Sequence, residues 1–221
     1  MGANALRGGA YKPCTYPVTN STSVGTYSWK EGLRVEGLKL LNLAKKETGL
    51  PIVTEIMHTS QLDDETLDIV DIIQVGTRNA QNYYLLDALG RIDKPVLLKR
   101  GLYGQVEDIL GACERIMVGG NHKIAICPRG VGGAPSTRHI FSNIWAPDLM
   151  VIPALKELTN IPVVYDPSHA CGYRNFVPPI AKAALAAGAH GLIIETHPIP
   201  DESISDPNQA ITFETLGEIY K

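Results

Sequence analysis

The chain has 221 residues, 44% of them hydrophobic, and this length fits one α/β domain with a substantial buried core. Its net charge of −3 does not favour nucleic acid as a partner, and no apolar run approaches the length of a membrane span. The N-terminus has no signal-peptide core, so we expect a cytoplasmic protein. The four cysteines form no CxxC pair, so we expect reduced thiols.

Short apolar segments alternate with helical patterns through the first half of the chain. A strand is predicted at 5–11, and a polar loop rich in Ser, Thr and Gly follows at 16–29. Apolar residues at helical spacing predict a helix at 33–46, which Gly49 ends as a C-cap. The segments that follow are predicted as strands at 51–57, 70–75, 95–98 and 123–127, and as helices at 61–68, 81–89 and 106–118.

A long irregular stretch at 131–147 separates the two halves of the pattern. Irregular segments of this length inside a compact domain are usually binding loops or lids. The alternation then resumes with a helix at 149–158, strands at 161–165 and 191–194, an Ala-rich helix at 176–187 and a closing helix at 213–220.

The β-α-β-α order predicts a parallel sheet with right-handed crossovers. We count about seven strands, whereas the closed form of such a sheet has eight. The prediction is therefore a single-domain (β/α)₈ TIM barrel over residues 1–221, with the N-terminal first strand and helix missing or rebuilt. A doubly wound open sheet is the alternative, although no strand is followed by a GxGxxG turn.

Cationic residues recur where predicted strands end. A single Arg in such a position is most often part of a surface ion pair. Cations on successive strands of a closed barrel converge on one end of it, where they suit a phosphate or carboxylate ligand. The cations in question are Arg7, Lys12, Arg78, Lys99, Arg100 and Arg129.

A second group of ionisable residues follows the last two predicted strands. It consists of His169, Glu195 and Asp206. One imidazole nitrogen with two carboxylates suits a divalent metal such as Mn²⁺, Fe²⁺ or Zn²⁺. The alternative is that these are solvated or hydrogen-bonded loop residues.

Five segments, in this order, carry a resemblance to a known family: LRGGAYKP, DIIQVGTRNAQN, KPVLLKRG, PVVYDPSHACG and GLIIETHP. From about Leu6 to the C-terminus the chain resembles the short microbial form of 3-deoxy-arabino-heptulosonate 7-phosphate (DAHP) synthase. The resemblance implies a metal-dependent transferase with a (β/α)₈ barrel. Such an enzyme condenses phosphoenolpyruvate with erythrose 4-phosphate in the shikimate pathway of aromatic amino acid biosynthesis and releases phosphate. It is expected to be a homo-oligomer, and the related 3-deoxy-octulosonate 8-phosphate synthases use arabinose 5-phosphate.

The resemblance also assigns roles to residues. It implies metal binding by His169, Glu195 and Asp206, and catalytic roles for Lys12, Asp166 and His169. The cations that match the phosphoenolpyruvate-binding set are Arg7, Lys12, Arg78, Lys99 and Arg129. Binding of the aldose phosphate is expected from Lys12, Pro13 and Thr15, and Arg174 is also expected to bind substrate.

Several motifs depart from the family pattern. The family's fourth metal ligand, a Cys in a GPCS motif, has no counterpart, and the KPRT motif has Cys14 in place of its Arg. The first expectation is that water fills that position; the alternative is a substitute thiolate ligand, for which Cys14 is preferred over Cys171. The family's usual CERG motif also lacks its Glu here, since the chain reads CPRG.

The alternative function is a divergent paralogue that binds phosphoenolpyruvate or another sugar phosphate, with a different aldose acceptor or a non-catalytic role.

Overall fold

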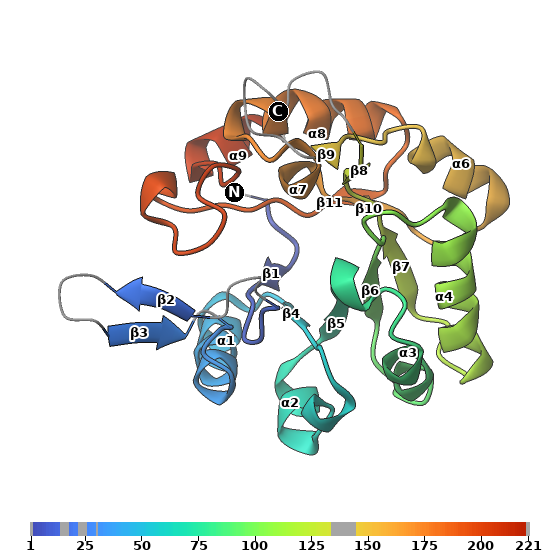
Figure 1. Ribbon diagram of the computed structural model, residues 1–221, viewed down its shortest axis with the longest axis horizontal. Helices are drawn as coiled ribbons and strands as arrows, with labels where there is room; N and C mark the ends of the chain where they lie inside the picture. The colour runs from blue at the N-terminus through green and yellow to red at the C-terminus, as the bar shows by residue number, and fades with distance from the viewer. Residues whose placement is uncertain (1, 14–17, 22–25, 30, 134–144, 220–221) are drawn as a thin grey trace. The chain divides into compact units, whose positions relative to one another are not determined.

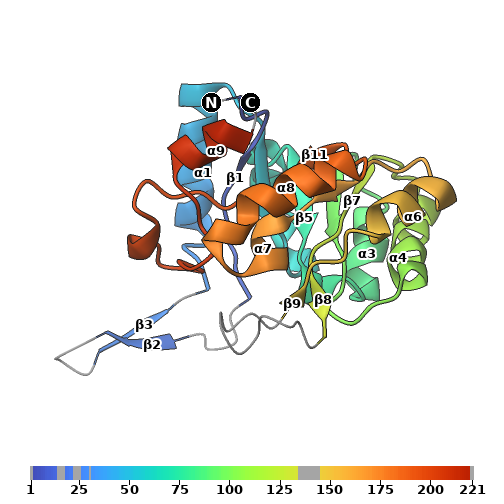
Figure 2. The same cartoon turned by 90° about the horizontal axis from the view of Figure 1, so that it is seen from above.

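The computed structural model describes residues 2–13, 18–21, 26–29, 31–133 and 145–219, and Figures 1 and 2 show it in two views. The chain divides into two compact units. The N-terminal unit comprises Ala3–Leu97 and Ala112–Lys123, and the C-terminal unit comprises Met1–Gly2, Leu98–Gly111 and Ile124–Lys221. Both units combine parallel strands with helices, which confirms the predicted α/β class.

Parallel strands form the centre of the N-terminal unit. β1 (Leu6–Arg7) pairs with β4 (Ile52–Glu55), and β4 pairs with β5 (Ile72–Val75). The next strand, β6 (Val96–Lys99), begins in this unit. All four side chains of β4 are buried, as expected of a strand that is covered on both faces.

The helices of this unit begin and end at local signals. α1 (Val35–Thr48) ends at Gly49, which has φ 69° and donates its N–H to the Lys45 carbonyl, so the predicted C-cap is confirmed. Asp63 caps α2 by accepting the Thr66 N–H at 2.8 Å. The other helical segments are α2 (Asp64–Ile69), α3 (Tyr83–Leu89), η1 (Thr59–Gln61) and η2 (Thr77–Asn79).

The predicted polar loop at 16–29 is wrong over most of its length. β2 (Val18–Ser21) and β3 (Thr26–Trp29) pair in antiparallel register, with Val18 opposite Trp29. Both segments contain β-branched or aromatic residues, which favour extended backbone. The Ser, Thr and Gly content of the stretch concealed this preference.

The C-terminal unit contains its own parallel strands. Ile126 of β7 (Ile124–Cys127) bridges in parallel to Val163, and β10 (Val164–Tyr165) pairs in parallel with β11 (Gly191–Leu192). Asp166 follows β10 directly, and Glu195 lies three residues beyond β11. The unit also holds the antiparallel pair β8 (Val131–Gly132) and β9 (Trp145–Ala146).

Helices complete the C-terminal unit. α4 (Val106–Val118) has the predicted bounds and is divided between the units. A short helix directly after β10 was not predicted, since the sequence there reads as polar residues beyond a strand. The remaining helices are α6 (Val151–Leu158), α7 (Pro167–Cys171), α8 (Val177–Ala186) and α9 (Phe213–Ile219), with η3 (Arg174–Phe176) and η4 (Pro200–Glu202). No helix among the described residues is long and apolar enough to cross a membrane.

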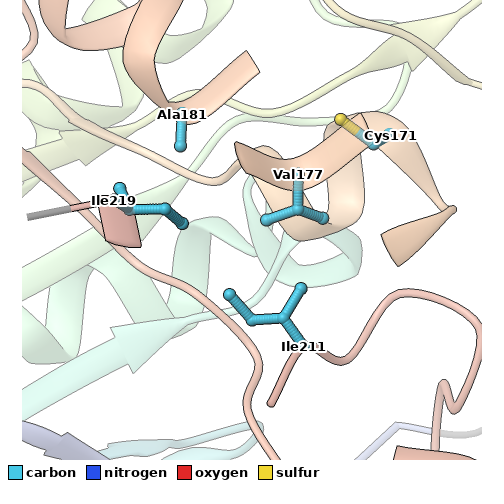
Figure 3. Close-up of a cluster of buried hydrophobic side chains, with 5 residues drawn as sticks. All are labelled: Cys171, Val177, Ala181, Ile211 and Ile219. Carbon is cyan, nitrogen blue, oxygen red and sulfur yellow. The ribbon is translucent and has the colours of Figure 1, made fainter. Parts of the chain in front are cut away.

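A buried cluster of apolar side chains joins the last helices of this unit. α8 packs against both α7 and α9. Figure 3 shows the cluster, which consists of Cys171, Val177, Ala181, Ile211 and Ile219. Cys171, the last residue of α7, belongs to this cluster, so the cluster anchors α7. His169 lies on the other face of the same helix.

Candidate active site

α7 places His169 at the end of β10. Asp166 is its N-cap, and the Asp166 carboxylate accepts the N–H of His169 at 2.9 Å. Pro167 occupies the first turn, and Gly172 ends the helix with φ 63°. The short sequence DPSHACG therefore contains both the start and the stop of the helix that presents the imidazole.

The three predicted metal ligands lie together in the C-terminal unit. One donor atom each from His169, Glu195 and Asp206 falls within 4.8 Å of the others. The Nε2 atom of His169 is 3.5 Å from Oε1 of Glu195. Asp206 has φ 53°, a left-handed conformation that Asp tolerates better than most residues. An imidazole and two carboxylates at this spacing fit a divalent metal ion.

Asp166 joins this group to the strand-end cation Lys99. The Lys99 ammonium donates to Oδ2 of Asp166, and Nδ1 of His169 lies 2.9 Å from the same oxygen. Lys99 is 4% exposed and Asp166 is 1% exposed. Burial alone raises the pKa of Asp166, but His169 and Lys99 together hold it well below the usual range. A carboxylate behind a metal-ligating imidazole is a common arrangement, since it orients the ring.

Two residues that sequence analysis missed hold Glu195. Its N–H donates to Oγ of Ser168 at 3.0 Å, and its Oε2 accepts from Nε2 of Gln209 at 2.8 Å. Both Ser168 and Gln209 are buried. Ser168 stands inside the DPSH segment and Gln209 stands three residues after Asp206, but sequence spacing alone does not show what their side chains contact.

Arg129 lies beside the same helix. Its Nη2 donates to the His169 carbonyl at 3.1 Å, and its guanidinium carbon is 5.1 Å from the centre of the Trp145 ring. Trp145 also meets Tyr103 edge to face, with ring centres 6.5 Å apart. Arg129 is thus held by the backbone of α7 on one side and by an aromatic ring on the other.

Two other cations of this unit have carboxylate partners. Arg100 pairs with Asp148 at 2.5 Å and donates to the Gly104 carbonyl, so it joins two loops. Arg174 pairs with Asp201 at 2.5 Å and donates to the Pro207 carbonyl at 2.8 Å. The predicted substrate-binding residue Arg174 therefore contacts the loop that carries Asp206.

The remaining predicted cations belong to the N-terminal unit. Arg7 lies 3.7 Å from Oε2 of Glu55, and Nη1 of Arg78 donates to the Pro13 carbonyl at 3.1 Å. Lys12 stands next to Pro13 in the same segment and is partly buried. The convergence of these residues with Lys99 and Arg129 stays a prediction, and Cys14 and Thr15 lie outside the described residues.

Cys171 does not take part in the metal group. It is buried in the apolar cluster of Figure 3, and its thiol donates to the Phe176 carbonyl at 3.4 Å. Burial raises the pKa of the Cys171 thiol to about 12, and does the same for Cys113. Neither forms a disulfide, in agreement with the prediction of reduced thiols.

The chain has extensive similarity to known proteins. Residues 5–221 match the model of the DAHP synthetase I family. The phospho-2-dehydro-3-deoxyheptonate aldolase of Thermotoga maritima is 40% identical over 222 residues, which cover 100% of this chain and 61% of that protein. The 2-dehydro-3-deoxyphosphooctonate aldolase of Syntrophobacter fumaroxidans is 31% identical over 95% of this chain and 74% of its own length.

Solved structures agree with the sequence comparison. The crystal structure of the Thermotoga maritima DAHP synthase matches 99% of this chain and 59% of its own, with a TM-score of 0.86 and 37% identity. A truncated form of the Thermotoga maritima synthase matches 99% of this chain and 73% of its own, with a TM-score of 0.82 and 36% identity. The chain thus spans about three fifths of the full Thermotoga protein.

Proposed function

The chain belongs to the DAHP synthetase I family, and from this premise we propose that it condenses phosphoenolpyruvate with erythrose 4-phosphate. The products are DAHP and inorganic phosphate, and the reaction is a transferase step that begins aromatic amino acid biosynthesis. One observation carries the proposal: buried Lys99 and His169, a member of the metal-type group of His169, Glu195 and Asp206, both contact a single carboxylate, Asp166.

The metal ligands are proposed to be His169, Glu195 and Asp206, with Cys14 as a further candidate. Their donor set suits Mn²⁺, Fe²⁺ or Zn²⁺. When bound, such an ion supplies Lewis acidity, which polarises an aldehyde oxygen. Asp166 keeps the His169 ring oriented, because its carboxylate lies against Nδ1 and also accepts the backbone N–H of the same residue.

The cations are proposed to bind the phosphoenolpyruvate trianion. Lys99 and Arg129 do so from the C-terminal unit, and they are only 4% and 7% exposed, so water screens their charge weakly. Arg7, Lys12 and Arg78 are the proposed contributors from the N-terminal unit. Pro13, Thr15 and Arg174 are proposed for the aldose phosphate, and Lys12 is proposed to act with Asp166 and His169 in catalysis.

The architecture proposed for this function is one (β/α)₈ barrel domain over residues 1–221. We also propose a cytoplasmic homo-oligomer. An experimental structure tests the barrel, and a sedimentation measurement tests the oligomer.

Phosphate release tests the activity. We expect release when the purified chain receives phosphoenolpyruvate, erythrose 4-phosphate and Mn²⁺ together, and no release when either substrate is left out. His169→Ala is the control, because it removes the imidazole of the metal group. Absence of release at every metal tested, with both substrates present, would contradict the proposal.

A different aldose acceptor is the second candidate. Two observations favour it: Cys14 replaces the expected Arg, and the Syntrophobacter relative is named a 2-dehydro-3-deoxyphosphooctonate aldolase. A thiol cannot give a phosphate the bidentate charged contact of an Arg. Arabinose 5-phosphate in the same assay separates the two candidates, and Cys14→Arg is expected to lower the KM for erythrose 4-phosphate.

A further inference from the structure

Gln209 contacts both carboxylate residues of the metal-type group. Its side-chain amide donates to Oε2 of Glu195 at 2.8 Å, and its backbone N–H donates to the Asp206 carbonyl at 3.1 Å. Gln209 is 8% exposed, so its amide is largely shielded from water. The position of Gln209 in the sequence does not indicate what its side chain does.

The backbone of Glu195 is held from two sides. Its N–H donates to Ser168 Oγ, and its carbonyl accepts the N–H of Ile211 at 3.0 Å. These contacts leave the carboxylate free to turn, because the last torsion of a Glu side chain is broad and roughly two-fold. The contact with Gln209 removes that freedom: Oε2 faces the amide, and Oε1 stays 3.5 Å from Nε2 of His169.

We propose that Gln209 is a positioning residue that fixes the Glu195 carboxylate, so that Oε1 is the oxygen presented to a metal beside His169. The inference rests on the proposed function only in that it requires the metal site. Gln209 touches neither the ion nor a substrate in this scheme, and it acts through Glu195 alone.

The chemistry of an amide suits this task. An ionised carboxylate only accepts hydrogen bonds, so the partner of Oε2 must be a donor, and the NH₂ group of Gln209 is one. A Lys or Arg here would also donate, but its positive charge would oppose a cation at the neighbouring oxygen. Gln209 donates without charge, so Glu195 and Asp206 keep their full attraction for a divalent ion.

The turn from Asp206 to Gln209 ties this amide to the other carboxylate ligand. The Gln209 N–H closes the turn on the carbonyl of Asp206, whose own φ of 53° is unusual for a residue with a side chain. The place of the amide is therefore set by the same short segment that carries Asp206.

Metal affinity in the absence of substrates tests the proposal. Metal-free wild type and Gln209→Met are titrated with Mn²⁺ in a calorimeter, since Met is similar in length and cannot donate. We expect affinity to fall by about 10- to 100-fold, the usual effect of losing a hydrogen bond to a metal ligand. Replacement of Mn²⁺ by Co²⁺ gives a second readout, a change in the visible absorption bands of the bound ion.

Gln74→Met is the matched control. Gln74 donates its amide to Oε2 of Glu55 at 3.1 Å and is also buried, but that pair lies in the other unit and outside the metal-type group. We expect this variant to lose stability without any change in Mn²⁺ affinity or in the Co²⁺ spectrum. Thermal unfolding of each metal-free protein shows that it is folded.

The outcomes separate the inference from the proposed function. His169→Ala that still binds Mn²⁺ with wild-type affinity would overturn the metal site itself. Loss of binding in His169→Ala together with wild-type affinity in Gln209→Met would overturn only the role of Gln209. If Gln209→Met does not fold, Gln209→Asn takes its place, because its side chain keeps an amide but is too short to reach Glu195. The same fall in Mn²⁺ affinity is expected for this variant. Wild-type affinity in Gln209→Asn would overturn the role of Gln209.

Discussion

Two glutamate–glutamine pairs, a buried one in the N-terminal unit and a partly buried one in the C-terminal unit, show how a third residue decides what a carboxylate can do. In the N-terminal unit Glu55 accepts from Gln74 and lies 3.7 Å from the guanidinium of Arg7. In the C-terminal unit Glu195 accepts from Gln209 and lies 3.5 Å from the imidazole of His169.

The two groups differ in whether the third residue, Arg7 or His169, has a lone pair to offer a metal ion. A guanidinium offers only donors, so Arg7 balances the charge of Glu55 and has no lone pair for a metal ion. A neutral imidazole offers a lone pair of its own, and together with Glu195 it suits a cation. The same amide contact thus accompanies an ion pair in one unit and a group suited to a cation in the other.

The largest expected effect comes from Lys99→Met in the C-terminal group. The substitution leaves Asp166 buried without its ammonium partner, so we expect unfolding free energy to fall by about 3–5 kcal/mol. Urea unfolding measures this. Lys123→Met is the control, since Lys123 and its partner Asp93 are exposed, and a pair of that kind contributes about 0–1 kcal/mol. Equal losses in the two variants would show that Asp166 does not depend on Lys99.

Glu195 differs from Glu55 in having the imidazole of His169 as a neighbour, and His169→Ala removes that imidazole. We expect Mn²⁺ affinity to fall by about 100-fold or more, or roughly 2.7 kcal/mol, as measured by calorimetry. Cys171→Ser on the same helix is the control, because Cys171 points into the apolar cluster and its replacement is expected to leave Mn²⁺ affinity unchanged. A fall in affinity in Cys171→Ser as large as that in His169→Ala would place the thiol near the ion.

Gly76→Ala disturbs the Glu55 pair without touching the metal group. A Cβ on Gly76 would overlap Oε1 of Glu55, so the carboxylate must move away from its partners. We expect a loss of about 1–3 kcal/mol of stability and unchanged Mn²⁺ affinity. Gly111→Ala is the control: its Cβ meets nothing within 4 Å, and in a helix the change is expected to stabilise by about 0.5–1 kcal/mol. A destabilised Gly111→Ala would point to a general intolerance of substitution.

The smallest expected effect concerns Asp71, a partly exposed carboxylate of the N-terminal unit. Burial raises its pKa, but the Ile52 N–H and the Lys45 ammonium outweigh burial and lower it overall. A pKa lower in the folded state stabilises above the unfolded value near 4, and this stabilisation is lost as pH falls through the folded pKa. We expect Asp71→Asn to cost about 1 kcal/mol at pH 7, with the difference from wild type vanishing in acid. A difference from wild type that does not shrink as the pH falls below the unfolded pKa near 4 would contradict this assignment.

Local patterns in the sequence determined much of the fold. The bounds of α4, the C-cap at Gly49 and the order of the parallel strands and the longer helices follow from apolar spacing and capping residues within one or two turns, whereas the pairs β2–β3 and β8–β9 and the short helix α7 did not. The proximity of the metal-type group was also predictable, because His169 and Glu195 follow two neighbouring parallel strands closely and Asp206 lies in the loop after the second of them.

Only the tertiary structure decided what these side chains contact. Lys99 and Asp166 are 67 residues apart in sequence, Arg100 and Asp148 are 48 apart, and Glu195 and Gln209 are 14 apart. Such pairs depend on which distant segments the tertiary fold brings together. The hydrophobic periodicity of the sequence carries no information about these contacts. The helical spacing of residues 169 and 171 likewise puts Cys171 in the core and His169 at the site, because one face of α7 must bury apolar surface while the other meets the strand ends.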